Sequence, residues 1–416
     1  MNLEPLRGMR DFYPREMARL NVLFSTWKVV LRKYNYLEID GPLLEDAKLW
    51  ELKSGNEIPE QMYSFKDKSD KHIAIRPELT PTLARMVAKK YKELVKPVKW
   101  FALARCFRYE APQAGRLREH FQLNVDCLGS SSMRSDAEVI ASAVDIMTAF
   151  GCTEKDFYIR LNNRKLIDAL LSKAGVKKQK LKEAARIIDK KEKISEKEFL
   201  DQLLKAVDDQ DVVDNIQKAL ELQFGLVDNS LEGYAELKEL LWHLESYGLS
   251  RFVRVDFSIM RGFDYYTSTV FEVFDASREF RAIAGGGRYD NLIADFGGDP
   301  CPGVGYGMGD VVLGLFLEKL GKLKAIEDEV EYFVAPVSDE VIDTAIKIAA
   351  SLRKKHSVDI DVSGKGLSKL LEYASNIKAG KVIIVGKKDL ENKEVTVRDM
   401  ISGQEKKLKL KSLLGE

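Results

Sequence analysis

The chain lacks the features that would place it in a membrane, in a disulfide framework or around a structural metal ion. Its 416 residues include four cysteines and four histidines, and none of them is spaced in the pairs that a zinc site or a disulfide framework requires. No apolar run approaches the roughly 20 residues of a membrane helix. The first residues, Met1 to Pro5, lack the charged-then-apolar plan of a signal peptide. We therefore expect a soluble, cytoplasmic, globular protein with buried thiols.

The chain also has almost no excess of one charge sign over the other. The net charge is +1, which argues against a protein that coats nucleic acid along its whole surface. A nucleic-acid partner would need local basic patches, because phosphate contacts supply most non-specific affinity. The length predicts two to four domains of about 150 residues each, and a hydrophobic content of 45% suffices for substantial cores.

The most informative segment is Arg261 to Tyr266, which places one guanidinium and two phenols in a turn between two strand-like stretches. Val253 to Ile259 alternates apolar and polar residues, and Thr269 to Phe274 has the composition of a second strand. The pattern predicts a β-hairpin that presents the six residues as a site. Taken alone, such a hexapeptide is better explained by a solvated turn with two packing tyrosines.

Further motifs decide between these explanations. Phe107 to Glu110 lies between two strand-like runs, Trp100 to Cys106 and His120 to Leu128, and resembles motif 2 of the class II aminoacyl-tRNA synthetases. Arg261 to Tyr266 and Ala284 to Asp290 resemble the two signature peptides of the histidyl-tRNA synthetases. The similarity extends over nearly the whole chain and includes Arg7 to Phe12, Arg76 to Thr80, Leu161 to Arg164 and Val395 to Asp399.

The resemblance implies an α+β catalytic domain with an antiparallel sheet and flanking helices, a helical insertion and a C-terminal α/β anticodon-binding domain. The residues themselves support this plan. Short Lys- and Glu-rich helices fill the middle of the chain, where Ser195 to Glu198 forms a capping box. Strands and helices alternate from Tyr332 onward, which predicts a small mixed sheet. The expected bounds are 1–161 with 248–325 (catalytic), 162–247 (insertion) and 331–416 (anticodon-binding).

Two regions carry expectations about partners. Leu20 to Tyr36 followed by short extended pieces around Pro42 resembles motif 1, which implies a homodimer. From the residues alone it is equally a surface helix before an edge strand, since Pro lacks a backbone donor. The basic run Lys173 to Lys197 is either a contact face for tRNA or, as charge runs usually are, a solvated helix surface.

The implied chemistry is amino-acid activation, in which a carboxylate attacks the α-phosphate of ATP and pyrophosphate leaves. Fixed cations must stabilise the charge on the non-bridging oxygens, and arginine suits this because its planar fork stays charged and donates two parallel hydrogen bonds. Arg108 and Arg261 are the candidate catalytic residues. The substrate carboxylate is already the nucleophile, so no general base is needed.

The resemblance also assigns substrate contacts. Glu78, Thr80 and Gln122 are expected to hold the α-ammonium of histidine, and Asp126, Tyr265 and Tyr266 its imidazole. The family often has Glu in the place of Asp126, so the reach of this carboxylate is shorter. ATP contacts are expected from Arg108, Glu110, Arg116, Arg261, Gly286 and Gly287, and contact with the acceptor end of histidine tRNA from Gln113. Mg²⁺ is expected to bind with ATP, and no protein ligand for it is assigned.

One motif departs from the pattern. In the motif-3 stretch Gly303 to Leu313, Val312 stands where class II synthetases have an arginine that braces the adenine and γ-phosphate. We expect another basic residue, Arg278 or Arg288, to supply this charge.

The departure keeps a second function open, a catalytically silent paralogue that binds histidine as a regulatory subunit of ATP phosphoribosyltransferase. Such chains resemble the catalytic domain without the anticodon domain, and a histidine sensor would not need both Arg108 and Arg261. A class IIa enzyme for another amino acid is disfavoured by the Arg261 to Tyr266 signature.

Overall fold

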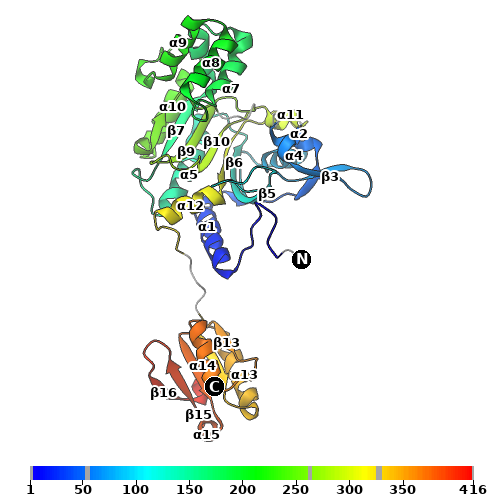
Figure 1. Ribbon diagram of the computed structural model, residues 1–416, viewed down its shortest axis with the longest axis vertical. Helices are drawn as coiled ribbons and strands as arrows, with labels where there is room; N and C mark the ends of the chain where they lie inside the picture. Colours follow the sequence, from blue (N-terminus) through cyan, green and yellow to red (C-terminus); the bar gives the residue numbers. More distant parts are fainter. Residues whose placement is uncertain (1–2, 52–56, 261–264, 325–329, 415–416) are drawn as a thin grey trace. The chain divides into compact units, whose positions relative to one another are not determined.

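The structure is a computed structural model that describes residues 3–51, 57–260, 265–324 and 330–414. The chain forms two compact units, residues 1–325 and 326–416, each with its own sheet (Figure 1). Arg261, Gly262, Phe263 and Asp264 lie outside the described residues.

Unit 1 is built on a sheet that has eight strands within the described ranges, in the order β1-β5-β6-β11-β10-β9-β7-β8. The β1–β5 and β7–β8 pairs are parallel and the other pairs are antiparallel. This confirms the predicted α+β class and the paired strands on either side of the motif-2 loop. The strands are β1 Leu37–Glu38, β5 Val98–Phe107, β6 Glu119–Leu128, β7 Phe157–Asn163, β8 Val253–Val255, β9 Thr269–Asp275, β10 Ala284–Arg288 and β11 Gly303–Gly309.

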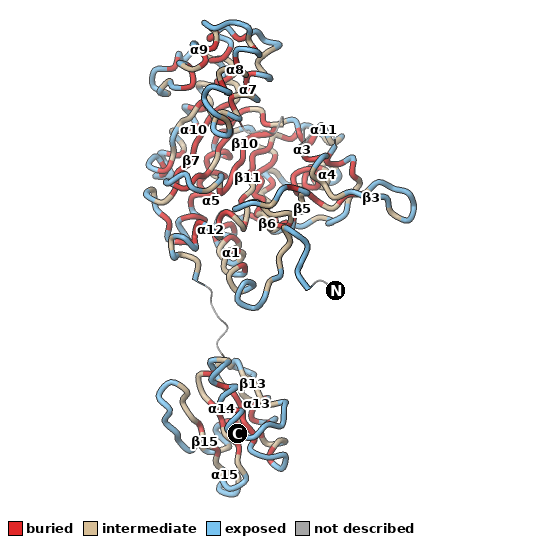
Figure 2. Tube along the Cα trace, viewed as in Figure 1, coloured by how far each residue is buried: buried red, intermediate tan, exposed pale blue. Residues whose placement is uncertain are grey.

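The two faces of this sheet have different surroundings. Side chains alternate between the faces along β6, and Leu123, Val125 and Cys127 are buried in the main core. That core is completed by α1 (Pro14–Lys33), α5 (Met133–Ala149), α10 (Tyr234–Ser246) and α12 (Asp310–Lys319). In α1 the apolar residues recur at helical spacing, so one stripe of the helix is buried. Figure 2 shows this continuous buried interior.

The opposite face of the sheet, which carries Gln122, Asn124 and Asp126, is bordered by the segment 37–97. Within it, α4 buries Leu83 and Val87 against Ile293 of α11, and β2, β4 and β3 form a small antiparallel sheet. The elements here are β2 Leu44–Asp46, α2 Lys48–Glu51, α3 Glu57–Gln61, β3 Tyr63–Lys66, β4 His72–Ile75, α4 Thr80–Lys90 and α11 Leu292–Asp295.

A helical block separates β7 from β8 in the sequence, as predicted, and it begins at Arg164 because β7 continues to Asn163. The predicted capping box is present: Ser195 Oγ accepts a hydrogen bond from the backbone N of Glu198 at 3.2 Å. Besides α10, the block contains α6 Arg164–Lys173, η1 Lys178–Lys180, α7 Leu181–Ile188, α8 Glu196–Val207, α9 Gln210–Leu220, η2 Phe224–Leu226 and η3 Ser250–Phe252.

The predicted hairpin around residues 261–266 is wrong. β8 pairs in parallel with β7, and β9 pairs with β7 on its other side, so β7 lies between the two expected hairpin strands. All seven residues of β7 are buried, and such a strand must be covered on both edges. The strands that precede and follow this segment in the sequence, β8 and β9, therefore lie on opposite sides of β7.

Unit 2 follows the predicted alternation closely. β12, β13 and β14 are parallel and joined by helices, and β15 and β16 extend the sheet in antiparallel fashion, in the order β13-β12-β14-β15-β16. The elements are β12 Tyr332–Pro336, η4 Asp339–Val341, α13 Ile342–Leu352, β13 Val358–Ile360, α14 Leu367–Asn376, β14 Lys381–Val385, α15 Lys387–Glu391, β15 Glu394–Asp399, β16 Glu405–Lys409 and α16 Leu410–Leu414.

Two further expectations from the sequence concern the burial of the cysteines and membrane-spanning helices. Cys106, Cys127, Cys152 and Cys301 are free and buried, which confirms the expectation. Within the described ranges, no helix combines the length and the apolar character that crossing a membrane requires.

Candidate active site

A cavity of about 120 Å³ lies in unit 1 on the face of the sheet that carries the even-numbered residues of β6. It draws on the segment before α4, the end of β5, the strands β6, β10 and β11, and the residues just before β9. Seven of the residues predicted from sequence line it: Glu78, Thr80, Arg108, Gln122, Asp126, Tyr265 and Tyr266. Asn124, Gly285, Tyr289, Gly305, Tyr306 and Gly307 also line it.

Glycines on β11 make room for the polar side chains of β6. Gly305 lies opposite Asp126 in the register, and a Cβ on Gly305 would come within 2.3 Å of Asp126 Oδ1. A Cβ on Gly307 would come within 2.7 Å of Gln122 Nε2. The absence of side chains at these positions is therefore what lets carboxylate and amide groups lie over the sheet.

Asp126 is buried at the floor of the cavity and accepts a short hydrogen bond at Oδ1 from the phenol of Tyr289. Burial raises the pKa of Asp126 to about 7, and the hydrogen bond from Tyr289 opposes this rise. Because only one carboxylate oxygen serves Tyr289, the other is available to accept from a ligand N–H.

Three tyrosines form an aromatic wall beside this carboxyl group. The ring centroids of Tyr265 and Tyr266 are 4.8 Å apart, and those of Tyr265 and Tyr289 are 6.0 Å apart in an edge-on arrangement. Such spacing is typical of stable aromatic contacts. The wall and Asp126 together place aromatic surface beside a carboxylate acceptor, a combination that suits an imidazole ring.

Glu78 and Thr80 enter the cavity from the start of α4 and are both buried. Their segment is held in place at two points. The indole Nε1 of Trp50 donates to the backbone O of Glu78 at 3.2 Å, and Arg76 Nη1 pairs with Asp40 at 2.6 Å. A carboxylate and a hydroxyl fixed beside Gln122 are acceptors that an ammonium group requires.

Arg108 lies just beyond the end of β5 and lines the cavity, and its Nε donates to the backbone O of Pro77 at 3.0 Å. This contact ties the guanidinium to the segment that carries Glu78. The second predicted catalytic arginine, Arg261, lies outside the described residues, so the expected convergence of the two guanidinium groups stays a prediction.

The motif-2 loop, residues 111–118, folds back on itself beside the cavity. The backbones of Gln113 and Arg116 exchange hydrogen bonds of 3.0 and 2.9 Å, which closes a tight turn and leaves Gln113 exposed. The Arg116 guanidinium forms an ion pair with the buried Glu110 carboxylate. Arg116 and Glu110 are thus neighbours, as an ATP-binding pair requires, although neither lines the cavity.

Gly286 and Gly287 belong to the regular strand β10 and do not line the cavity, whereas Gly285 does. A Cβ on Gly286 would come within 2.1 Å of the Gly305 carbonyl oxygen, and one on Gly287 within 2.3 Å of the Thr269 carbonyl oxygen. The local reason for glycine at these two positions is close packing of strands, and their predicted contact with ATP remains untested.

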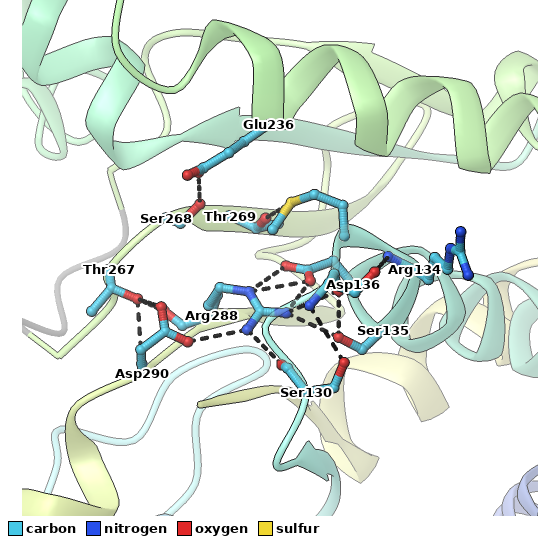
Figure 3. A network of polar contacts seen from close by, with 12 residues as sticks. Ser130, Arg134, Ser135, Asp136, Glu236, Thr267, Ser268, Thr269, Arg288 and Asp290 are labelled. Atoms are coloured by element: carbon cyan, nitrogen blue, oxygen red, sulfur yellow. Dashed lines mark hydrogen bonds and ion pairs between the residues drawn. The ribbon is translucent and has the colours of Figure 1, made fainter. Parts of the chain in front are cut away.

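The structure does not support the expectation that Arg288 or Arg278 supplies the missing motif-3 charge. Arg288 is buried, and all its guanidinium nitrogens are engaged: it pairs with Asp136 and Asp290 and donates to the Ser135 hydroxyl and to backbone oxygens, as Figure 3 shows. Arg278 Nη1 donates to the Tyr158 phenol at 3.0 Å, and Nη2 pairs with Glu192 at 2.5 Å.

Sequence reasoning overlooked several lining residues. Asn124 follows Gln122 and precedes Asp126 at a spacing of two, so the alternation of β6 already placed it on the same face. Tyr289 lies within the quoted signature peptide 284–290. Tyr306 gave no such signal, because its phenol lies 3.2 Å from the Ser142 hydroxyl of α5 and belongs to the core side of the sheet. In the described ranges, no cluster of three or more His, Cys, Asp or Glu side chains is arranged to hold a metal ion.

An antiparallel sheet with a motif-2 strand pair and a cavity on its open face defines the catalytic domain of a class II aminoacyl-tRNA synthetase. A family model described as histidyl-tRNA synthetase matches residues 8–309, and one described as anticodon binding domain matches residues 331–416. The chain belongs to the histidyl-tRNA synthetase family.

Full-length relatives agree with this assignment. The histidine–tRNA ligase of Haloarcula marismortui is 38% identical over 99% of this chain and 97% of its own length. That of Thermococcus kodakarensis is 39% identical over 98% and 96%. The crystal structure of histidyl-tRNA synthetase from Nostoc sp. PCC 7120 has the same fold, with a TM-score of 0.82, coverage of 99% and 98%, and 24% identity.

Proposed function

We propose that this protein is a histidine–tRNA ligase. It activates L-histidine with ATP to histidyl-adenylate and pyrophosphate, and then transfers histidine to the 3′ end of histidine tRNA. The observation that carries the proposal is the convergence of Glu78, Gln122, Asp126 and Tyr266 with Arg108 on one cavity. These residues come from four separate segments, and an amino-acid site beside a cation is what adenylation requires.

Histidine recognition divides between the two sets of polar groups in the cavity. Glu78, Thr80 and Gln122 accept from the α-ammonium group. The free carboxylate oxygen of Asp126 accepts from one imidazole nitrogen, and a phenol donates to the other. A site that hydrogen-bonds both ring nitrogens rejects analogues that lack them by about 10⁴ to 10⁵, since buried polar groups would be left unpaired.

Catalysis then consists of positioning and charge stabilisation. The carboxylate oxygen of histidine attacks the α-phosphorus, and the bond from that phosphorus to the pyrophosphate oxygen breaks. Arg108 and Arg261 hold the non-bridging oxygens as charge builds up on them. In the second step a hydroxyl of the terminal adenosine attacks the carbonyl of the adenylate, and AMP leaves.

Mg²⁺ supplies additional positive charge to the phosphates when it binds with ATP. We assign no protein ligand to this ion, because Mg²⁺ is commonly held mainly by phosphate oxygens and water.

The remaining assignments concern architecture and partners. We place the catalytic domain at 1–163 and 248–325, the insertion at 164–247 and the anticodon-binding domain at 331–416, with the first boundary moved from 161 to the end of β7. Exposed apolar side chains occur along the motif-1 region: Val29 on α1, Leu37 on the edge strand β1, and Leu43 and Leu44 after Pro42. This surface supports a homodimer formed through the motif-1 region. We assign the protein to the cytoplasm. In the motif-2 loop, Gln113 contacts the acceptor end of the tRNA and Arg116 contacts ATP.

The test is exchange between ATP and labelled pyrophosphate with each of the twenty amino acids in turn, followed by charging of histidine tRNA. Exchange that depends on histidine alone, together with charging, is the expected result. Histidine binding without exchange would instead identify the silent regulatory paralogue. That alternative is not favoured, because the chain continues into a domain that matches the anticodon-binding family.

A further inference from the structure

Arg10 lies beside the active site and is not explained by the contacts that it makes. Its Nη2 pairs with Asp310 Oδ2 at 2.8 Å and approaches the backbone O of Glu119 at 3.5 Å. Its Nε is buried and has no hydrogen-bond acceptor within the described part of the chain. The side chain is 26% exposed. An arginine that uses one of its three nitrogens for protein contacts has donors left for an anion.

The place of Arg10 relative to the cavity follows from the register. Asp310 is the first residue of α12, directly after Gly309, which pairs with Gln122 of the cavity floor. Asp310 also accepts from the backbone N of Phe121 at 2.8 Å. Arg10 is therefore fixed beside the first residues of β6, next to the cavity. Its ion-pair partner Asp310 lies two residues before Val312, the position at which the motif-3 arginine is missing.

The same point gathers positive charge. His120 lies on the cavity face of β6, two residues before Gln122. Burial lowers the pKa of its imidazole, and the nearby positive charges of Arg108 and Arg10 lower it further. The motif-2 loop closes over this region: Gly8 accepts at its backbone O from the backbone N of Arg118 at 2.9 Å. A Cβ on Gly115 would lie 3.2 Å from Val312 Cγ2. The segment 8–12, the loop and the first turn of α12 thus meet around one cationic end of the site.

We propose that Arg10 is an ATP-binding residue that contacts the β- and γ-phosphates and supplies, from the N-terminal segment, the charge that Val312 cannot. The inference rests on the proposed function, because it takes the nucleotide to be ATP. The ion pair with Asp310 orients the guanidinium, and the exposed edge of the group donates to phosphate oxygens.

The experiment compares Arg10→Gln with Arg19→Gln. Arg19 Nη1 pairs with Glu318 at 2.7 Å near the other end of the same helix, so its loss controls for a broken ion pair between the N-terminal region and α12. Calorimetry measures binding of Mg²⁺–ATP and of AMP to each variant. Loss of one charged hydrogen-bond donor predicts that Arg10→Gln weakens ATP binding by about tenfold or more, leaves AMP binding within about twofold, and raises KM for ATP but not for histidine. Arg19→Gln should change neither nucleotide by more than about twofold.

Equal losses for ATP and AMP, or no loss for either, would overturn the proposal. If Arg10→Gln is too unstable to measure, Arg10→Gln with Asp310→Asn removes both partners, leaves no buried carboxylate unpaired and should show the same selective loss. Failure of the wild-type protein to exchange pyrophosphate would refute the ligase function, whereas the comparison of ATP with AMP tests Arg10 independently of catalysis.

Discussion

The two ends of the active site are built in different ways. The end that we assign to histidine has its floor on paired strands, with Gln122, Asn124 and Asp126 in alternation opposite a row of glycines, and Glu78 and Tyr266 from outside the strands complete it. The end that we assign to the triphosphate lies at the residues of β6 just before Gln122 and takes most of its cations from connecting segments. Arg10 comes from the N-terminal segment, Arg116 from the motif-2 loop and Arg261 from the connection between β8 and β9.

This difference has a functional consequence. Discrimination among amino acids requires fixed donors and acceptors, which a hydrogen-bonded sheet provides. The triphosphate is recognised mainly through its charge, which arginines from several segments can supply. The strand end is expected to tolerate little change in shape, and the loop end is expected to respond mainly to changes in charge.

The largest expected effect is at the loop end. Arg261→Ala should reduce the rate of histidine-dependent pyrophosphate exchange by about a hundredfold or more, because a preorganised donor to the transition state contributes roughly 3 kcal/mol. The matched control is Arg278→Ala, since Arg278 pairs with Glu192 and Tyr158 away from the cavity. Its rate should stay within about twofold. A loss of less than tenfold for Arg261→Ala, with folding preserved, would contradict the catalytic role.

The same contrast explains which parts were predictable from sequence. The alternation of β6 and the βαβ order of unit 2 follow from local patterns, and the predicted strands at Tyr332–Pro336 and Lys381–Val385 agree with the structure at both ends. Residues on one strand face, such as Gln122 and Asp126, come together because the strand period of two forces them to. Their grouping in one cavity needed only the strand and the family motif.

Long-range pairing was not predictable in this way. Nothing local in Val253 to Phe274 shows that β7 is inserted between β8 and β9, so the expected hairpin was wrong. The search for a replacement of the motif-3 arginine failed for a similar reason. Arg288 follows three glycines and looked available, but Asp136, 152 positions earlier in the sequence, holds it in the interior. Only the fold reveals such partners.

At the strand end, the largest effect is expected from a change in the shape of the cavity. Gly305→Ala would place a Cβ 2.3 Å from Asp126 Oδ1 and 2.5 Å from the Val125 carbonyl oxygen, so the carboxylate must move. We expect KM for histidine to rise by about tenfold or more, as overpacking by one methyl group costs about 1–3 kcal/mol, while KM for ATP changes less. Gly309→Ala, at the end of the same strand, is the control, because nothing lies within 4 Å of its added Cβ. Equal effects of the two variants would show that Gly305 is not needed for space.

A smaller effect is expected from the hydrogen bond that orients Asp126. Tyr289→Phe removes a donor that lowers the pKa of Asp126, so this pKa, already raised to about 7 by burial, should rise further. Since the ionised form accepts from the imidazole, histidine binding should improve as pH rises through this pKa, and the variant should need a higher pH for the same affinity. At pH 7 its KM for histidine should be about three- to tenfold higher.

The measurement is KM for histidine between pH 6 and 9. The imidazole of the substrate titrates near pH 6.5 as well, but it is the same for both proteins, so the shift between the two profiles reports on Asp126. Tyr34→Phe serves as a control, because it removes another phenol–carboxylate hydrogen bond, to Asp145, between residues that do not line the cavity. Superimposable profiles for wild type and Tyr289→Phe would show that Tyr289 does not influence Asp126 during binding.

The smallest effect is expected one step further from the substrate, where Thr267 joins the two segments that carry the tyrosines. Thr267 directly follows Tyr266, and Asp290 directly follows Tyr289. The Oγ1 of Thr267 donates to Asp290 Oδ2 at 2.9 Å (Figure 3). Thr267→Val keeps the shape and removes this link, so KM for histidine should rise by about two- to threefold, near the lower limit for one hydrogen bond. Thr396→Val breaks a similar hydroxyl–carboxylate bond, to Asp389 in unit 2, and should leave KM unchanged. If both variants lost thermal stability equally but neither altered KM for histidine, the Thr267–Asp290 hydrogen bond would not be needed to position the two tyrosines.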